Sequence, residues 1–265
     1  MKRILFLAVI VSLCSVMLFS CTSMKEKNGV ITYLRTDGAG YDNIIKSHEH
    51  VQKYRGETVC YNSNDEMINA LVSREIKSFT VSESIAKRIA QDNEELTVSD
   101  RDIGRVSYAM MTTDREEDAY SMLNGAISML KTRGVIDELA AKYIGSGLST
   151  NIEMPYFGGE QTLKIGIVGE MSPIDSVSDK GEGVGFNVAL LAKIAETLEI
   201  NIKTVKIDSS ERVSALRSGK IDALFCVRIE MNCPLCDDTL DVDAISGMAL
   251  TESYLTEKNR IVILK

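Results

Sequence analysis

The stretch that decides the fold runs from Leu216 to Cys226 and reads LRSGKIDALFC. A helix predicted to begin at Ser210 ends at Leu216, and Gly219 closes it, because glycine readily takes the left-handed conformation that ends helices. The apolar run from Ile221 to Cys226 then predicts a buried strand. A helix that leads through a tight turn into a buried strand is typical of an α/β fold.

The same alternation extends upstream of this stretch. Strands are predicted at Leu163 to Val168 and at Ile202 to Ile207, and a strongly apolar helix at Val188 to Leu198 lies between them. A last strand is predicted at Ile261 to Leu264. Strands that alternate with helices favour a largely parallel sheet.

The first half of the chain alternates in the same way. The predicted strands are Val30 to Leu34, Thr58 to Tyr61, Phe79 to Val81 and Val106 to Met111, and the predicted helices are Tyr41 to Gln52, one that begins at Asn64 or Asp65, Glu83 to Gln91, Arg115 to Lys131 and Val135 to Tyr143. A polar loop from Ser146 to Gln161 separates the halves. We therefore expect an α/β protein of two lobes, each a mixed, mostly parallel sheet flanked by helices.

The composition bounds the function. The chain has 265 residues, 45% of them hydrophobic, and its 30 Lys and Arg against 38 Asp and Glu give a net charge of -8. This balance argues against a nucleic-acid partner, because no basic excess is available to neutralise phosphates. His48 and His50 lie two apart on a predicted helix and so point to different faces, and Asp237 to Asp243 lacks the Gly and terminal Glu of a calcium loop. We expect no metal, no cofactor and no enzymatic activity, since no catalytic motif is found.

Residues 1–21 are typical of an export signal. Lys2 and Arg3 precede an apolar run that is short for a membrane span. The end of the run, Leu18-Phe19-Ser20-Cys21, resembles the lipobox of bacterial lipoproteins, in which the Cys is lipidated. A plain secretory signal and an uncleaved anchor are the alternatives. We expect a protein that is lipid-anchored to a membrane by Cys21 outside the cytoplasm, with residues 22–29 as a tether.

Four cysteines follow the leader, in a compartment that permits disulfides. Cys233 and Cys236 form a CxxC, which suits a local disulfide, a redox dithiol or half of a zinc site. The acidic residues that follow disfavour a thiolate, and no second CxxC completes a zinc site, so a structural disulfide is favoured. Whether Cys60 and Cys226 pair stays open.

Several motifs of the second half resemble bacterial extracellular solute-binding proteins of family 3, many of which bind amino acids for import by ABC transporters. These motifs are Leu163-Lys164-Ile165-Gly166-Ile167, Pro173, Gly185-Phe186-Asn187-Val188, Leu216-Arg217-Ser218-Gly219-Lys220-Ile221-Asp222-Ala223 and Thr251-Glu252-Ser253-Tyr254-Leu255. The resemblance implies a two-lobed fold of the type II periplasmic-binding-protein kind.

The first half resembles the other lobe of the same family, so the two lobes stand in reversed order. This order predicts a circular permutation, and a remnant of an array of such domains is the alternative. The implied organisation is a second-lobe-like half at 30–112, helices that pack on the other lobe at 113–145, a linker at 146–161 and a first-lobe-like half at 162–265. Closure within one chain and exchange of lobes between two chains both stay open.

The resemblance also implies ligand-binding residues in the cleft between the lobes. One set is the glycine-rich turn Thr36, Asp37, Gly38, Ala39 and Gly40, where a helix N-terminus offers N–H groups to an anion. The others are Ser82, Glu83, Ser172, Ile174 and Arg228. The turn can equally be an ordinary strand-to-helix connection, and Arg228 a solvated charge.

The chain departs from the family pattern where the ligand is held. Met231 and Pro234 stand at the positions of the T-x-x-R motif, whose Arg binds the ligand carboxylate, and Ser82 stands where the family has an acid. A free amino acid would therefore leave its charges poorly paired. We expect a small polar ligand, amino-acid-like or another carboxylate, delivered to an ABC permease. The alternative is a ligand-sensing or interaction lipoprotein that has lost transport and works with a membrane sensor.

Overall fold

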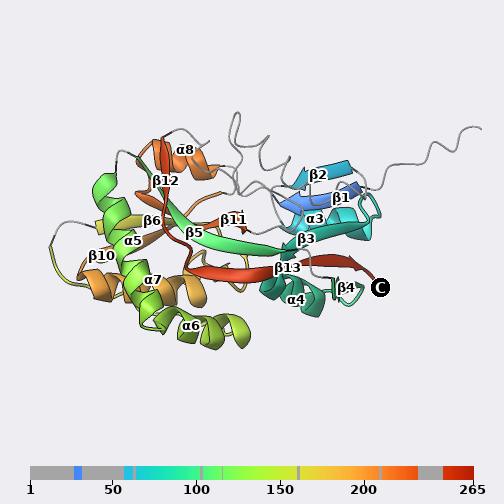
Figure 1. Cartoon of the computed structure of the whole chain (residues 1–265), viewed down its shortest axis with the longest axis horizontal. Helices are drawn as coiled ribbons and strands as arrows, with labels where there is room; N and C mark the ends of the chain where they lie inside the picture. Colours follow the sequence, from blue (N-terminus) through green and yellow to red (C-terminus); the bar gives the residue numbers. More distant parts are fainter. Residues whose placement is uncertain are drawn as a thin grey trace, which may run out of the picture.

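The computed structural model describes residues 27–31, 57–61, 64–101, 104–114, 116–159, 162–208, 211–231 and 247–265. These residues form a mixed α/β fold around one ten-stranded sheet (Figure 1). The strands follow the order β10 (Asn201–Lys206), β6 (Thr162–Ile167), β11 (Ala223–Met231), β5 (Arg105–Thr113), β13 (Leu255–Leu264), β3 (Ser78–Ser82), β1 (Lys27–Ile31) and β2 (Glu57–Tyr61). Beside this path, β12 (Met248–Leu250) pairs with β5, and β4 (Leu96–Ser99) pairs with β13. The predicted fold class, α/β, is confirmed.

Figure 1 shows the elements gathered into two lobes, with β5 and β13 running between them. The α7 lobe contains β5, β6, β10, β11 and β12 with the helices α5 (Glu117–Thr132), α6 (Val135–Leu139), α7 (Phe186–Leu198) and α8 (Arg212–Arg217). The α4 lobe contains β1 to β4 with α3 (Asn64–Val72) and α4 (Glu83–Asp92). The strand β13 belongs to both lobes, because residues 255–258 pair with β5 and residues 259–264 pair with β3 and β4.

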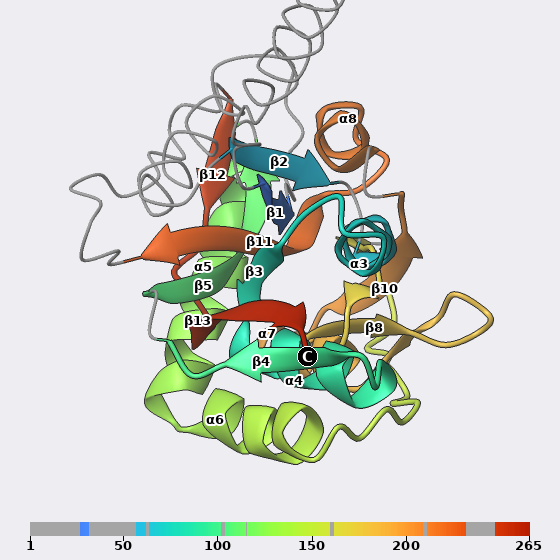
Figure 2. The ribbon, with the colours of Figure 1, turned by 90° about the vertical axis from the view of Figure 1, so that its right-hand side faces the viewer.

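The direction of the strands changes where the chain crosses between the lobes. In the α4 lobe β1 is parallel to β2 and β3, and in the α7 lobe β6 is parallel to β10 and β11. The crossing strands β5 and β13 are antiparallel to every strand they pair with. The sheet is therefore mixed rather than mostly parallel, and it is continuous through both lobes. In Figure 2, which faces the α4 lobe, β13 runs beside β3 and β4 with α4 packed against it.

The helix α7 forms the centre of its lobe. Nine of its thirteen residues are buried, among them Leu190 and Leu191, and it packs against α5, α6 and β10. A helix that is apolar over most of its surface is expected to be covered on most sides. It begins at Phe186, two residues before the predicted start, because Gly185 takes a φ of 73° and turns the chain into the helix.

Most predicted helices and strands lie where the pattern placed them, and the differences have local causes. Three short strands, β7 (Glu170–Met171), β8 (Asp175–Val177) and β9 (Gly183–Val184), form a small antiparallel sheet between β6 and α7, where no strand was predicted. The strand β5, expected with the first half, pairs inside the α7 lobe. The helix predicted after Val135 ends as a π-helix, η1 (Ala140–Gly145). The predicted helix from Tyr41 to Gln52 lies outside the described residues.

Candidate functional site

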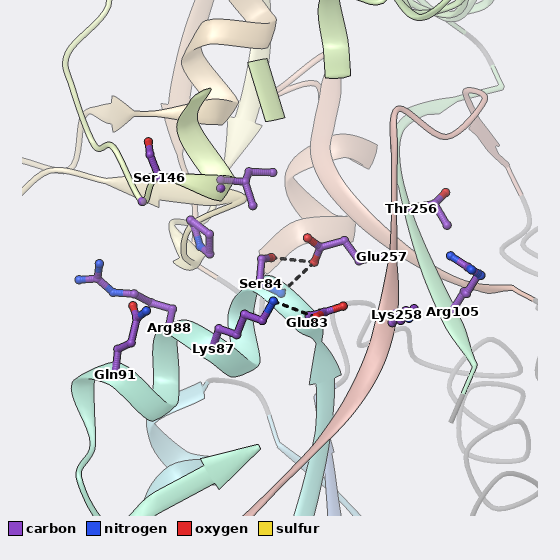
Figure 3. A pocket seen from close by; sticks show the side chains of 14 residues that line it. Glu83, Ser84, Lys87, Arg88, Gln91, Arg105, Ser146, Thr256, Glu257 and Lys258 are labelled. Atoms are coloured by element: carbon purple, nitrogen blue, oxygen red, sulfur yellow. Dashed lines mark hydrogen bonds and ion pairs between the residues drawn. The ribbon is translucent and has the colours of Figure 1, made fainter. Parts of the chain in front are cut away.

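A cavity of about 540 Å³ lies where the two lobes meet the crossing strands (Figure 3). Its lining comes from four places in the fold: α4, the end of η1 with the residues after it, Pro173, and the facing residues of β5 and β13. Two further hollows of similar size are lined by residues of the α7 lobe and the segments beside it. Of these three hollows among the described residues, the cavity beside α4 is lined by both lobes, and we call it the interlobe cavity.

The start of α4 forms one wall of the interlobe cavity. Ser82 ends β3 in an extended conformation, and the helix begins at Glu83. The Glu83 carboxylate forms an ion pair with Lys87 at 2.9 Å and another with Arg260 of β13 at 3.4 Å. The hydrogen bond from Lys87 is the main cause that lowers the pKa of Glu83. The Glu83 carboxylate is thus already paired with two cationic side chains of the protein.

A second carboxylate, Glu257 of β13, is bound to the same helix. Its Oε2 accepts a hydrogen bond from the Ser84 hydroxyl at 2.7 Å and one from the Ser84 backbone N–H at 3.2 Å. Figure 3 shows Glu257 directed toward Ser84. A negative charge is favourable at a helix N-terminus. These two bonds tie the crossing strand to the α4 lobe.

The crossing strands contribute residues of both their faces to the lining. On one face, Glu257 of β13 is directed toward Ser84 of α4. On the other face, Lys258 of β13 is in register with Arg105 of β5, and Thr256 is in register with Ser107. The hydroxyls of Ser107 and Thr256 are hydrogen-bonded at 2.7 Å. Successive side chains of a strand point to opposite faces, and Figure 3 shows Thr256 and Arg105 on the far side of β13 from α4.

The loop that holds Pro173 is fixed by a buried carboxylate, Asp175. This carboxylate accepts hydrogen bonds from the backbone N–H groups of Val168 and Gly169 at 3.0 and 3.1 Å and from the side chain of Asn187 at 2.6 Å. Burial is the main cause that raises the pKa of Asp175, and these hydrogen bonds oppose it. The loop is therefore held to the first turn of α7 by the Asp175 carboxylate.

Between this loop and β13 the interior is filled by aromatic side chains. Tyr254 stacks on Phe225 with ring centroids 5.1 Å apart and lies 6.2 Å from Phe186. Cys226 beside them is a free thiol, and burial raises its pKa well above the usual range. A thiol that stays protonated is a poor nucleophile and a poor metal ligand. No group of side chains suited to a metal ion is found within the described ranges.

Of the predicted site residues that the structure describes, Glu83 lines the interlobe cavity. Ser172 is not part of the lining, although Pro173, which follows it through a cis peptide bond, is. Ser82 and Ile174 are buried, 1% and 0% exposed, and neither is part of the cavity lining. Ser82 Oγ has no hydrogen-bond partner among the described residues.

The other predicted positions are placed only in part. Arg228 lies in β11, with its backbone opposite Tyr108. The turn from Thr36 to Gly40 and the cysteines Cys21, Cys233 and Cys236 lie outside the described residues, and of Cys60 only the backbone, in β2, is described.

Sequence reasoning missed most of the lining. The charged lining residues that it did not single out are Lys87, Arg88, Arg105, Glu257 and Lys258. The unbroken polar run from Thr256 to Arg260 has no alternation of polar and apolar residues that would indicate a strand. The pairing of Lys258 with Arg105 joins strands far apart in the sequence, which no local pattern reveals.

Comparison with known proteins gives one sequence match and several distant structural ones. Residues 163–229 match the sequence profile of the bacterial extracellular solute-binding proteins, family 3. A comparison with curated proteins finds no match. No helix among the described residues is long and apolar enough to cross a membrane.

Three solved structures illustrate the structural likeness. The GluR0 ligand-binding core in complex with L-glutamate is 13% identical, with 92% of this chain and 86% of that chain covered and a TM-score of 0.39. An ancestral arginine-binding protein bound to arginine is 15% identical, with coverages of 91% and 84% and a TM-score of 0.41. CbnR, a LysR family transcriptional regulator, is 10% identical, with coverages of 100% and 71% and a TM-score of 0.43.

The sequence match spans β6, α7, β10, α8 and most of β11, which are five of the elements of the α7 lobe. The motifs read from the sequence, from Leu163 through the Gly219 turn, lie inside it. Residues 163–229 are therefore similar to the bacterial extracellular solute-binding proteins, family 3.

Proposed function

We propose that the protein binds a small polar solute in the interlobe cavity, outside the cytoplasm, and delivers it to an ABC permease. The observation that carries this proposal is the cavity of about 540 Å³ whose lining joins α4, the crossing strands and the Pro173 loop. Its size falls within the roughly 300–1,000 Å³ typical of small-molecule sites. The described lining does hold a hydroxyl bonded to a carboxylate, Ser84 with Glu257, but Glu257 also accepts the Ser84 backbone N–H, an arrangement that ties β13 to α4, so binding is proposed rather than catalysis.

The proposal includes a lipid anchor at Cys21. It is supported by the charged start, the apolar run and the LFSC sequence at residues 18–21. A Cys21→Ser variant is expected to leave the membrane fraction or to keep its leader, while wild type is recovered in the membrane fraction as a shorter, lipid-modified chain. Mass spectrometry of both forms distinguishes these results. An unmodified Cys21 in a wild-type chain that has lost its leader contradicts the anchor and leaves solute binding untouched.

The proposal also includes reversed lobe order relative to the family. The geometry that supports it lies around Ser78 at the start of β3. On one side of β3, Val262 of β13 is in register with Phe79, and on the other side Asn28 of β1 is in register with Ser78. The last residues of β13 and the first of β1 therefore lie at the same end of β3, two strand spacings or about 10 Å apart. A short connection can join them.

A sensing role is the second candidate function. It is favoured by Met231 and Pro234, which stand at the positions of the family's T-x-x-R motif. A sensor and a transport protein can share the same bound solute, so the two differ in partner. Co-purification of the wild-type chain with an ABC permease supports transport, and co-purification with a membrane receptor supports sensing.

Solute binding is tested on the full chain in detergent. Native mass spectrometry of the protein as purified, and thermal unfolding with a panel of metabolites, are expected to show one solute bound. At a solute concentration 100 times Kd the stabilisation is about 2.7 kcal/mol. Ser146→Trp, which fills the exposed rim of the cavity, is expected to abolish the effect.

The control variant is Ser149→Trp, in the same exposed segment but outside the lining. It is expected to bind as wild type does. A solute that binds equally well to both Trp variants lies elsewhere, and that result would refute the interlobe cavity as the site.

A further inference from the structure

Large apolar side chains are exposed mainly in the segment after η1, residues 146–159. Of the five that are exposed among the described residues, three lie in this segment, and two of those, Tyr156 and Phe157, are consecutive. Tyr156 is 79% exposed and Phe157 is 42% exposed. Single exposed apolar residues are ordinary, but adjacent exposed aromatic rings are typical of surfaces that bind another protein. We call these two residues the aromatic pair.

The aromatic pair is exposed although its segment is held firmly to the α7 lobe. Ile152 and Met154, just before it, are partly buried and pack against the core. The backbone N–H of Phe157 donates to the Oδ1 atom of Asn201 at 3.0 Å, and the side-chain amide of Asn201 donates to the backbone oxygen of Gly158 at 2.8 Å. Asn201 is itself only 6% exposed. A surface that is already fixed loses little conformational entropy when it binds a partner.

A hollow of about 510 Å³ adjoins the aromatic pair. Gly158 and Asn201, which bond to each other beside the pair, are part of its lining. The charged lining residues are four carboxylates and one lysine, a surplus of three negative charges; they are Glu116, Asp118, Glu199, Asp222 and Lys164. We call this hollow the acidic hollow.

Most carboxylates of the acidic hollow are left without a cation. Glu116, Asp118 and Glu199 form no ion pair with any residue that the structure describes. The ammonium group of Lys164 donates to the backbone oxygen of Gly219 at 3.1 Å. Glu199 caps the C-terminal end of α7, where a negative charge is unfavourable because the helix dipole is negative there. A cationic group of another molecule would relieve this repulsion.

Apolar rings beside a negative hollow fit one kind of occupant. Lysine and arginine side chains pair with carboxylates and also bind over the faces of aromatic rings. A second copy of this chain is a poor occupant, because each copy carries a net charge of -8. We propose that the aromatic pair and the acidic hollow form a docking surface for a second protein, which presents a basic segment with lysine or arginine next to an apolar side chain. The inference goes beyond solute binding, since this surface shares no residue with the lining of the interlobe cavity.

Photo-crosslinking of the full chain in its native host cells identifies the partner. Phe157 is replaced by p-benzoylphenylalanine, and mass spectrometry after irradiation identifies the segment that becomes linked to it. The matched control carries the same replacement at Val72 of α3, which is 43% exposed on the other lobe. The replacement at Phe157 is expected to give an adduct with a second protein through a segment of net positive charge. The replacement at Val72 is expected not to give this adduct.

The chemistry of docking is measured by fluorescence anisotropy with two labelled peptides, Lys-Lys-Leu-Lys-Lys and Glu-Glu-Leu-Glu-Glu, and the full chain in uncharged detergent. The lysine peptide is expected to bind, more weakly as salt rises, and the glutamate peptide is not. Tyr156→Ala is expected to weaken binding about tenfold by loss of the ring. Glu199→Gln is expected to weaken it about two- to fivefold by loss of one exposed charge. Glu94→Gln, an equal change of charge at an exposed position of the α4 lobe, is the control and should bind as wild type does.

Three results would overturn the docking surface. One is no adduct at Phe157, or the same adduct at Phe157 and at Val72. Another is an adduct with a second copy of this chain or with a segment that lacks net positive charge. The third is equal binding of the lysine peptide by wild type, Tyr156→Ala and Glu199→Gln, or equal binding of the two peptides. Because the Tyr156 side chain is mostly exposed, Tyr156→Ala should unfold at the wild-type temperature, so weaker binding is not a folding defect. Solute binding is measured separately with the metabolite panel and is expected to be unchanged in both variants.

Discussion

At the scale of single residues, Asp175 decides the shape of the loop at the cavity. One carboxylate holds two backbone N–H groups and the Asn187 side chain, so the loop cannot move without breaking three hydrogen bonds at once. Asn187 extends this hydrogen-bond network, because its side-chain amide also donates to the backbone oxygen of Ser176 at 2.9 Å. The Pro173 wall of the cavity is therefore preformed.

Asp175→Ala is expected to lower the free energy of unfolding by about 3 kcal/mol, because it leaves buried donors without an acceptor. Urea unfolding measures this change. Asp179→Ala is the control, since Asp179 is exposed in the same segment, and its effect should stay within about 0.5 kcal/mol. Equal effects of the two substitutions would show that the network does not hold the loop.

Glu170, at the start of the same loop, gives a prediction for pH. Burial is the main cause that raises its pKa, although Arg212 opposes the shift, and its Oε2 is buried with no hydrogen-bond partner within the described ranges. A carboxyl group whose pKa is raised by folding favours the folded state at low pH, and this contribution is lost as pH rises through the folded pKa.

Glu170→Gln removes the charge that folding disfavours. The variant is expected to be more stable than wild type at pH 7 and no more stable at pH 4, measured by urea unfolding at both values. Glu182→Gln, further along the same segment, is the control, and no pH-dependent difference is expected from it. A variant that is less stable than wild type at pH 7 would mean that Arg212 outweighs burial.

At the scale of elements, the sequence pattern was informative wherever an element buries one strong apolar face. The helices α4, α5 and α7 and the strands β6 and β10 were predicted within about two residues, because hydrophobic spacing alone separates helix from strand. The short strands β4, β7, β8, β9 and β12 were not predicted. Two to four residues carry too little periodicity to distinguish a strand from a turn.

The strand β13 shows why the site was harder to predict than the fold. Only Ile261 to Leu264 was predicted as a strand, because the preceding residues 255–260 are mostly polar. These residues cross between the lobes, and three of them, Thr256, Glu257 and Lys258, belong to the lining of the interlobe cavity. The lining of a binding site is often polar, so hydrophobic periodicity does not detect it. Which strands pair, and in which register, is decided by the tertiary structure.

The burial of α7 gives a prediction at this scale. Leu190 is 0% exposed in the middle of the helix, whereas Leu148, in the segment after η1, is 41% exposed. Leu190→Ala is expected to cost about 3 kcal/mol of unfolding free energy through lost contacts and a cavity. Leu148→Ala, the same chemical change, should cost less than about 1 kcal/mol. Similar losses from the two would place α7 outside the cooperative core.

At the scale of the whole molecule, two strands carry the connection between the lobes. The last residues of β13 pair with β3 and β4 of the α4 lobe, while its first residues pair with β5 of the α7 lobe. The interlobe cavity lies against these strands, so a solute there contacts both lobes and the connection between them. The pairing of β13 with β3, β4 and β5 does not depend on which lobe comes first along the chain.

The independence of the fold from lobe order supplies the last prediction. In a rearranged chain, residues 162–265 come first, a linker of about six residues spans the roughly 10 Å between β13 and β1, and residues 27–159 follow. It is expected to unfold cooperatively within a few degrees of the original and to bind the same solute. A control chain that uses the same linker but begins and ends inside α7 should not fold, because it breaks a buried helix. If the rearranged chain fails to fold while the original does, the two lobes are not arranged as in the family, and the proposed permutation is wrong.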